Sequence, residues 1–154
     1  MPFFRKVFFI SVLFLTVGCA EKPSTFVATP DDAGVWKSVP LHSHYGFFAN
    51  KNQEVWRRVV DILSEKYDLE VFDRTSGYIR TSWKPELPTV DDDDNKYRSR
   101  VIIKMLGKIW HTAKLKVETQ LWDDTNETWI SGYDTAVLEE VYKDIQGRIG
   151  TSVR

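Results

Sequence analysis

The chain has 154 residues and a formal net charge of −1 at neutral pH, and 42% of its residues are apolar. This length suits one domain with a substantial core and leaves little room for two. The near-neutral charge lacks the basic footprint of nucleic-acid-binding proteins, so we expect no nucleic acid as a partner. A single cysteine excludes a disulfide within the chain, so stability has to come from the core.

The first 18 residues have the layout of a secretory signal peptide. Arg5 and Lys6 form a basic start, and the run from Val7 to Val17 is apolar apart from one serine and one threonine. A basic start, an apolar run of about 7–15 residues and small residues at the cut are typical of such peptides. The run is too short to span a bilayer, which needs roughly 20 residues. Cleavage after residue 18 would leave 136 residues with a formal charge of −3, because the two cations are lost.

The only cysteine follows the apolar run directly, in the sequence Leu15-Thr16-Val17-Gly18-Cys19. This stretch resembles the bacterial lipobox, which implies that Cys19 is acylated and becomes the mature N-terminus. The alternative is a plain signal peptide followed by a cysteine by chance. A lipid on the sulfur explains the position of a lone cysteine in an oxidising compartment, and two or more acyl chains anchor stably. By resemblance to the enterobacterial sorting rule, Ala20 implies the outer membrane, with the protein facing the periplasm.

Residues 19–41 are predicted to form a tether between the lipid and the domain. The segment holds three prolines and shows no sustained period of 2 or 3.6 residues. Trp36, Val39 and Leu41 are nevertheless more apolar than a spacer needs. Two interpretations stay open at this point. These side chains pack back on their own domain, or they become ordered on the surface of a partner protein.

Residues 42–154 are predicted to form a single α+β domain with the element order β-α-β-β-β-β-α. The clearest element is an amphipathic helix from Asn50 to about Tyr67, because its apolar residues recur every three or four positions. A second amphipathic helix is predicted from about Thr135 to Ile149. The strands are expected at 43–48, 69–73, 78–83, 98–105 and 113–122.

The two strands at 98–105 and 113–122 show the strictest alternation of apolar and polar side chains. This pattern predicts an antiparallel sheet with one buried face and one wet face. Helices collected on one face of such a sheet make a two-layer α+β domain, which is the fold class we expect. Turns are predicted at 74–77 and 123–127, the first with Gly77 at positive φ.

The sequence contains no motif that points to catalysis: no nucleophile elbow, zinc-protease helix, redox cysteine pair or phosphate-binding loop occurs. We therefore expect no enzyme. His42 and His44 would share one face of a strand, but the sequence places no third metal ligand with them. The acidic run from Asp91 to Asp94 lacks the glycine and the glutamate that an EF-hand needs at its sixth and twelfth positions. We expect no metal and no cofactor besides the lipid on Cys19.

The succession of motifs resembles the repeated domain of BamC-type lipoproteins, accessory subunits of the outer-membrane β-barrel assembly machinery. The resemblance covers about residues 45–150 and rests on helix 54–63, the strands at 67–71 and 75–83, and the Arg98-x-Arg100 start of the next strand. It implies a helix-grip fold, in which an antiparallel sheet curves round a C-terminal helix, and protein binding without catalytic residues. The family carries two such domains and a longer N-terminal segment, whereas this chain has room for one domain.

We therefore predict a non-enzymatic outer-membrane lipoprotein that binds other envelope proteins, with the β-barrel assembly complex as the expected partner. Trp36, Val39 and Leu41, together with an exposed sheet or helix face, are the predicted contact. One alternative is a carrier that holds an apolar ligand between the helix at 135–149 and the strands at 99–121. Another is a lipoprotein that binds cell-wall glycan through surface tryptophans.

The tryptophans offer a way to locate a contact surface. Trp56 and Trp83 are expected in the core because they belong to the packing pattern of the first helix and the strand that ends at Trp83. Exposure of Trp110, Trp122 or Trp129 would instead mark a surface that a partner covers, since large exposed aromatic groups cluster at binding sites.

Overall fold

The computed structural model describes residues 22–30, 34–41, 51–86 and 96–149. Cys19, the predicted strand at 43–48, the histidines at 42 and 44 and the acidic run at 91–94 lie outside these ranges. The elements in chain order are β1 (Phe26–Ala28), β2 (Lys37–Pro40), α1 (Lys51–Ser64), β3 (Leu69–Asp73), β4 (Tyr78–Thr81), β5 (Lys84–Pro85), β6 (Tyr97–Leu106), β7 (Thr112–Asp123), β8 (Thr128–Asp134) and α2 (Thr135–Arg148).

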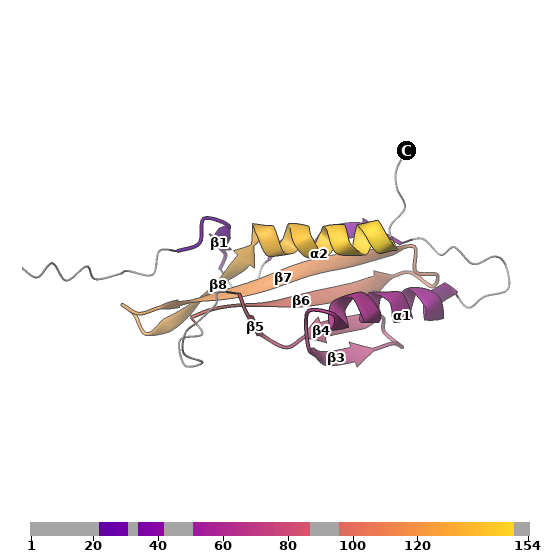
Figure 1. Ribbon diagram of the computed structural model, residues 1–154, viewed down its shortest axis with the longest axis horizontal. Helices are drawn as coiled ribbons and strands as arrows, with labels where there is room; N and C mark the ends of the chain where they lie inside the picture. The colour runs from indigo at the N-terminus through magenta and orange to yellow at the C-terminus, as the bar shows by residue number, and fades with distance from the viewer. Residues whose placement is uncertain (1–21, 31–33, 42–50, 87–95, 150–154) are drawn as a thin grey trace, which may run out of the picture.

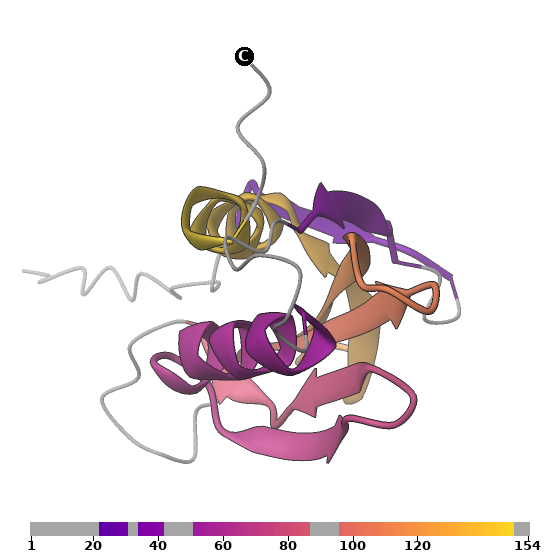
Figure 2. The same ribbon diagram turned by 90° about the vertical axis from the view of Figure 1, so that its right-hand side faces the viewer.

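The strands form one antiparallel sheet in the order β1-β8-β7-β6-β4-β3, with β2 paired to β7 and β5 paired to β6. Its centre is the long hairpin β6–β7, whose register runs from Tyr97 opposite Leu121 to Leu106 opposite Thr112. Both helices lie on the same side of the sheet, which curves round them (Figures 1 and 2). The predicted two-layer α+β class is confirmed, including a C-terminal helix on the sheet.

The core fills the space between the helices and the inner face of the sheet. On β6 and β7 every second side chain points into it, and Val101, Ile103, Leu115 and Val117 are completely buried. The helices contribute the apolar stripes that the sequence predicts: Val55, Val59, Ile62 and Leu63 from α1, and Val137, Leu138, Val141 and Ile145 from α2. The alternation predicted for this hairpin is therefore confirmed for the inner face, whereas Ile102, Lys116 and Glu118 in the middle of the other face are buried as well.

Asp134 connects the start of α2 to the sheet. One carboxylate oxygen caps the helix by accepting from the backbone N–H groups of Ala136 and Val137, at 2.7 and 3.2 Å. The other accepts from the hydroxyls of Thr25 and Tyr97. Such a cap satisfies backbone donors that a helix start otherwise leaves without partners. Burial and the hydrogen bond to Asp134 both raise the pKa of Tyr97 above its ordinary value.

The segment predicted as a tether supplies two strands of the sheet, which corrects the expected element order. In β1, Phe26 pairs with Asp134 of β8, and its ring packs edge-on against Tyr97, with centroids 5.9 Å apart. In β2, Val39 pairs with Ala113 of β7 and is completely buried. The segment joins the sheet because its few apolar side chains fill the inner face, which outweighs its weak local propensity.

Three further differences concern local structure. The strand β8 was not predicted, and the short β5 lies where the prolines indicated a break. Helix α1 ends at Ser64, a few residues before Tyr67, whose side chain is still buried in the core.

The predicted turn at 74–77 is confirmed, and Gly77 has the expected positive φ of 67°. A side chain there would meet the Cβ of Met105 at 2.7 Å.

Candidate functional site

The outer face of the β6–β7 hairpin carries polar and aromatic side chains along its whole length. The cross-strand pairs on this face are Arg98 with Gln120, Arg100 with Glu118, Ile102 with Lys116, and Lys104 with Lys114. Both helices pack against the opposite side, so neither covers this surface (Figure 2). We call it the outer face.

One end of the outer face holds a group of planar side chains that contact one another: Trp83, Arg98, Arg100, Trp122 and Trp129, which we call the aromatic–arginine cluster. The Arg98 guanidinium lies 4.1 Å from the ring centroid of Trp129 and 5.0 Å from that of Trp83. The Arg100 guanidinium lies 4.4 Å from the ring of Trp83. Trp122 and Trp129 form an edge-to-face pair with centroids 5.3 Å apart. Cation–π contacts and aromatic pairs of this kind each contribute about 0.5–1.5 kcal/mol.

Hydrogen bonds hold the arginine at the centre of this cluster in one orientation. Arg98 donates from Nε and Nη2 to the same amide oxygen of Gln120, at 2.9 and 2.7 Å. Its partner is a neutral amide, so this positive charge is not neutralised by an ion pair within the described residues. Burial, with a smaller effect of the neighbouring Arg100, lowers the pKa of Arg98. The guanidinium stays charged because an arginine pKa is so high.

Glu118 links the cluster to the lysines farther along the hairpin. Its carboxylate lies 2.7 Å from Arg100 and 2.8 Å from Lys116, and only 11% of its side chain is exposed. Burial raises the pKa of Glu118, but the hydrogen bonds from Lys116 and Arg100 outweigh this effect and hold the pKa below its ordinary value. Glu118 is therefore ionised at neutral pH and fixes both cations on the outer face.

The predicted partner-binding residues do not act as a group. Val39 and Leu41 are buried in the protein's own core, with 0% and 3% of their surface exposed. Of the two interpretations of this segment, packing on its own domain applies to them, and it removes their side chains from any contact surface. Trp36 is 42% exposed and lies on the outer face, with its ring 6.0 Å from the amine of Lys116. It is the one residue of the three with accessible side-chain surface.

Only some of the buried and partly exposed tryptophans are the ones that the sequence predicts. Trp56 is buried as predicted, and it packs against Trp110, with ring centroids 5.9 Å apart. Trp110 is therefore a core residue rather than a contact residue. Trp83, predicted in the core, is half-buried beside the two arginines because the chain leaves β4 at Thr81 and crosses to the outer face. Trp122 and Trp129 are also half-buried and belong to the cluster.

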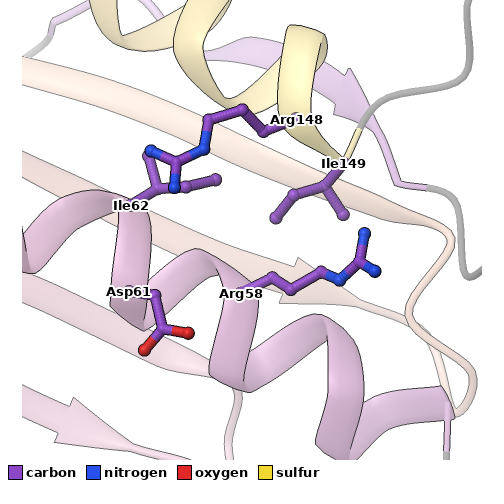
Figure 3. A pocket seen from close by; sticks show the side chains of 5 residues that line it. All are labelled: Arg58, Asp61, Ile62, Arg148 and Ile149. Atoms are coloured by element: carbon purple, nitrogen blue, oxygen red, sulfur yellow. The ribbon is translucent and has the colours of Figure 1, made fainter.

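Two hollows of the described structure lie away from the site expected for a carried ligand. A hollow of about 190 Å³ between the helices is lined by Arg58, Asp61, Ile62, Arg148 and Ile149 (Figure 3). Arg148 forms a bidentate ion pair with Glu65, with both contacts at 2.7 Å, and Arg58 pairs with Glu54 at 3.1 Å. A second hollow, of about 320 Å³, lies where α1 ends, between residues 64–68 and 82–85.

The space between α2 and the hairpin, where an apolar ligand was considered, is occupied by side chains. Val141 and Ile145 of α2 belong to one continuous core cluster with Leu115 and Val117 of β7, and all four are at least 97% buried. Closely packed apolar side chains leave no room for a ligand without rearrangement. The core thus offers the carrier alternative no preformed site among the described residues.

Among the described residues, no group of three or more histidine, cysteine, aspartate or glutamate side chains is arranged to hold a metal ion. No helix in this part of the chain is long and apolar enough to cross a membrane.

No protein-family model matches the chain, and no curated protein sequence matches it. The resemblance to BamC-type lipoproteins thus rests on the sequence motifs alone.

The sequence contained a usable signal for the aromatic–arginine cluster. Arg98 and Arg100 occupy alternate positions of a predicted strand on its wet face, and Trp122 has the same parity on the next strand. What sequence reasoning missed is the convergence of Trp83 and Trp129, because it depends on β8 and on the crossing after β4, neither of which was predicted.

Proposed function

We propose that this protein is a non-enzymatic, periplasm-facing lipoprotein of the outer membrane that binds another envelope protein through the outer face of its sheet. The lipobox-like stretch ending at Cys19 supports the anchoring. The observation that carries the binding role is the aromatic–arginine cluster on a sheet face that neither helix covers. Tryptophan and arginine are the residues most enriched among those that dominate protein–protein binding energies.

The geometry of the cluster suits a protein partner because its planar groups are already ordered. Arg98 is held by Gln120 and by two indole rings, so little side-chain freedom remains to be lost on association. The cluster is also partly desolvated, which strengthens its polar contacts with a complementary surface. Assembly of outer-membrane β-barrels is the process we propose for the complex, on the resemblance to BamC-type accessory subunits.

The binding role can be tested by cross-linking in intact cells. Tagged full-length protein would be cross-linked, extracted from envelopes with detergent and analysed for covalently attached proteins. We expect one or a few envelope proteins with the native chain and their loss with Arg98→Ala. Arg57→Ala is the matched control, because Arg57 is exposed on α1, in the other layer. Recovery of the native protein always alone, or sedimentation only with purified cell-wall glycan, would contradict the proposal.

Anchoring and pathway need separate measurements. Incorporation of labelled palmitate into the native chain, and its loss with Cys19→Ala, would support acylation at this residue. Deletion of the gene is expected to lower the amounts of outer-membrane β-barrel proteins. Unchanged amounts, with cross-linked partners still present, would keep the binding role and remove the assembly assignment.

A further inference from the structure

The second end of the outer face differs from the aromatic–arginine cluster, because it places like charges directly opposite each other. Lys104 of β6 is the cross-strand partner of Lys114 of β7, and both side chains are exposed. Like charges in this position destabilise a sheet. Lys116 follows on the same side of β7, but it is buried and paired with Glu118, and the exposed indole of Trp36 lies 6.0 Å from its amine. We call Lys104, Lys114, Lys116 and Trp36 the lysine end.

The charge of the outer face is strongly positive although the whole chain carries a formal charge of −1. On β4, β6 and β7 this face presents six cations and the single carboxylate of Glu118: Arg80, Arg98, Arg100, Lys104, Lys114 and Lys116. Arg80 pairs with Glu70 of β3, and Glu118 serves both Arg100 and Lys116. For Lys104 and Lys114 the described residues provide no ion pair.

We infer that the lysine end binds an acidic, extended segment of the partner protein, with carboxylates on alternate residues. This inference rests on the proposed function and names the chemistry of the partner. Directly opposite residues of two antiparallel strands have Cβ atoms about 4.5–5.5 Å apart, so one carboxylate held above β6 and β7 can lie between the amines of Lys104 and Lys114. Carboxylates on alternate residues of an extended segment lie about 6.6–6.8 Å apart, so one would reach this pair and the next would lie farther along the outer face. The first would relieve the repulsion between the two lysines.

A protein segment fits this surface better than a lipid surface does. The rings of Trp83, Trp122 and Trp129 lie against arginines or against each other and are half-buried. These three rings are not free to insert among acyl chains, which is how aromatic residues anchor at a membrane interface. The indole of Trp36 is exposed, but it lies at the lysine end, with its ring 6.0 Å from the amine of Lys116. A flat, ordered surface of rings beside a row of cations is complementary to a strand with acidic side chains.

The test uses the processed chain with Cys19→Ser and three kinds of probe. These are a short peptide that alternates glutamate and threonine, its lysine–threonine counterpart, and vesicles of either phosphatidylglycerol or phosphatidylcholine. Binding is followed by calorimetry and by tryptophan fluorescence at low and high salt. We expect binding of the acidic peptide alone, weakening as salt is raised. Lys104→Glu combined with Lys114→Glu should lower the affinity about tenfold or more.

Charge-matched variants separate a local effect from a general one. Lys104→Glu alone is compared with Lys143→Glu, which makes the same charge change on the exposed side of α2. We expect weaker binding only for the first. Equal effects of the two, no binding of the acidic peptide, or binding of phosphatidylglycerol vesicles with the same dependence on Lys104 would overturn the inference. If the lysine variants retain the cross-linked partner while Arg98→Ala loses it, the proposed function stands and the acidic-segment inference fails.

Discussion

The two faces of the β6–β7 hairpin are built from alternate residues of the same two strands, yet they have opposite chemistry. The inner face is apolar and completely buried at Val101, Ile103, Leu115 and Val117. The outer face presents arginines, lysines and tryptophans that contact one another but no helix. Because successive side chains of a strand point to opposite faces, the pairing register of β6 with β7 determines which residues are buried and which lie on the outer face.

Stability and the proposed binding role depend on neighbouring positions of the same two strands, so substitutions can separate them. Burial of the inner residues stabilises the fold, and this stabilisation does not depend on which residues occupy the outer face. Contacts among the charged and aromatic side chains of the outer face offset the free-energy cost of their partial burial. Glu118 pairs with two cations, and Arg98 contacts two indoles and an amide.

The largest expected effect belongs to the inner face. Leu115→Ala should lower the free energy of unfolding by about 2–5 kcal/mol, because it removes a fully buried side chain and leaves a cavity. Urea denaturation measures this directly. At urea concentrations where the Leu115→Ala variant is still folded, it should bind the partner as the native protein does, because Leu115 does not lie on the outer face. Lys114→Ala, one residue away on the outer face, is the control and should change stability by less than about 0.5 kcal/mol.

The next effect belongs to the aromatic–arginine cluster and should appear in binding. Arg98→Ala should weaken partner binding at least about thirtyfold, about 2 kcal/mol, with a smaller loss of stability. The affinity for the partner identified by cross-linking is the measurement, with urea denaturation in parallel. Arg98→Lys keeps the charge but not the planar stacking, so it should restore only part of the affinity. A full rescue by lysine would show that the stacking with Trp83 and Trp129 is unimportant.

A third variant tests the junction between the sheet and α2. Asp134→Ala removes the helix cap and the acceptor for Thr25 and Tyr97, and should cost about 1–3 kcal/mol. We expect a lower melting temperature and faster amide exchange at the start of α2 and in β1. If exchange in β1 is unchanged, the Thr25 contact does not help to hold that strand.

The smallest effect is a pH dependence with opposite signs at two glutamates. The pKa of Glu118 is lowered in the fold, so its stabilisation is present above its unfolded value of about 4.3 and is lost as pH falls through the folded pKa. Burial raises the pKa of Glu86, so folding favours its protonated form and that contribution is lost as pH rises through the folded pKa.

Two substitutions separate these contributions in pH-dependent melting curves. Glu118→Gln should reduce stability at neutral pH and flatten the loss of stability on acidification. Glu86→Gln should raise stability at neutral pH, because one of its carboxylate oxygens is buried without a hydrogen-bond partner. The same sign for both substitutions at neutral pH would contradict the assignment of opposite shifts.

Much of the fold could be predicted because its main elements have strong local periodicity. The two helices and the strands β3, β4, β6 and β7 were all expected near their observed positions. The short strands β1 and β2 could not be recognised, since three or four residues among prolines carry no period. They are strands because β8 and β7 offer free edges and because Phe26 and Val39 fill the inner face.

The candidate site was only partly predictable for a related reason. A wet face on β6 and β7 followed from alternation, and Trp122 and Trp129 were named as possible contact residues. The placement of Trp83 beside Arg98 and Arg100 depends on a crossing between strands, which local sequence does not encode. Val39 and Leu41 are buried in the protein's own core, which local sequence does not reveal, because an apolar residue in a proline-rich segment has the same local signature whether its own core or another protein buries it.

If Cys19 carries the proposed lipid, the pairing of β1 with β8 limits how far the domain can lie from the membrane. Phe26 is the seventh residue after Cys19, and an extended chain covers at most about 3.3–3.6 Å per residue, so this stretch spans at most about 25 Å. If β1 left the sheet, the chain between Cys19 and the start of β2 at Lys37 could span up to about 60 Å. Gly132 is the point of closest approach, because a Cβ there would lie 2.2 Å from the carbonyl oxygen of Val27. The three-residue strand β1 would thus limit the distance between the lipid on Cys19 and the domain, and with it the distance at which the domain could bind its partner.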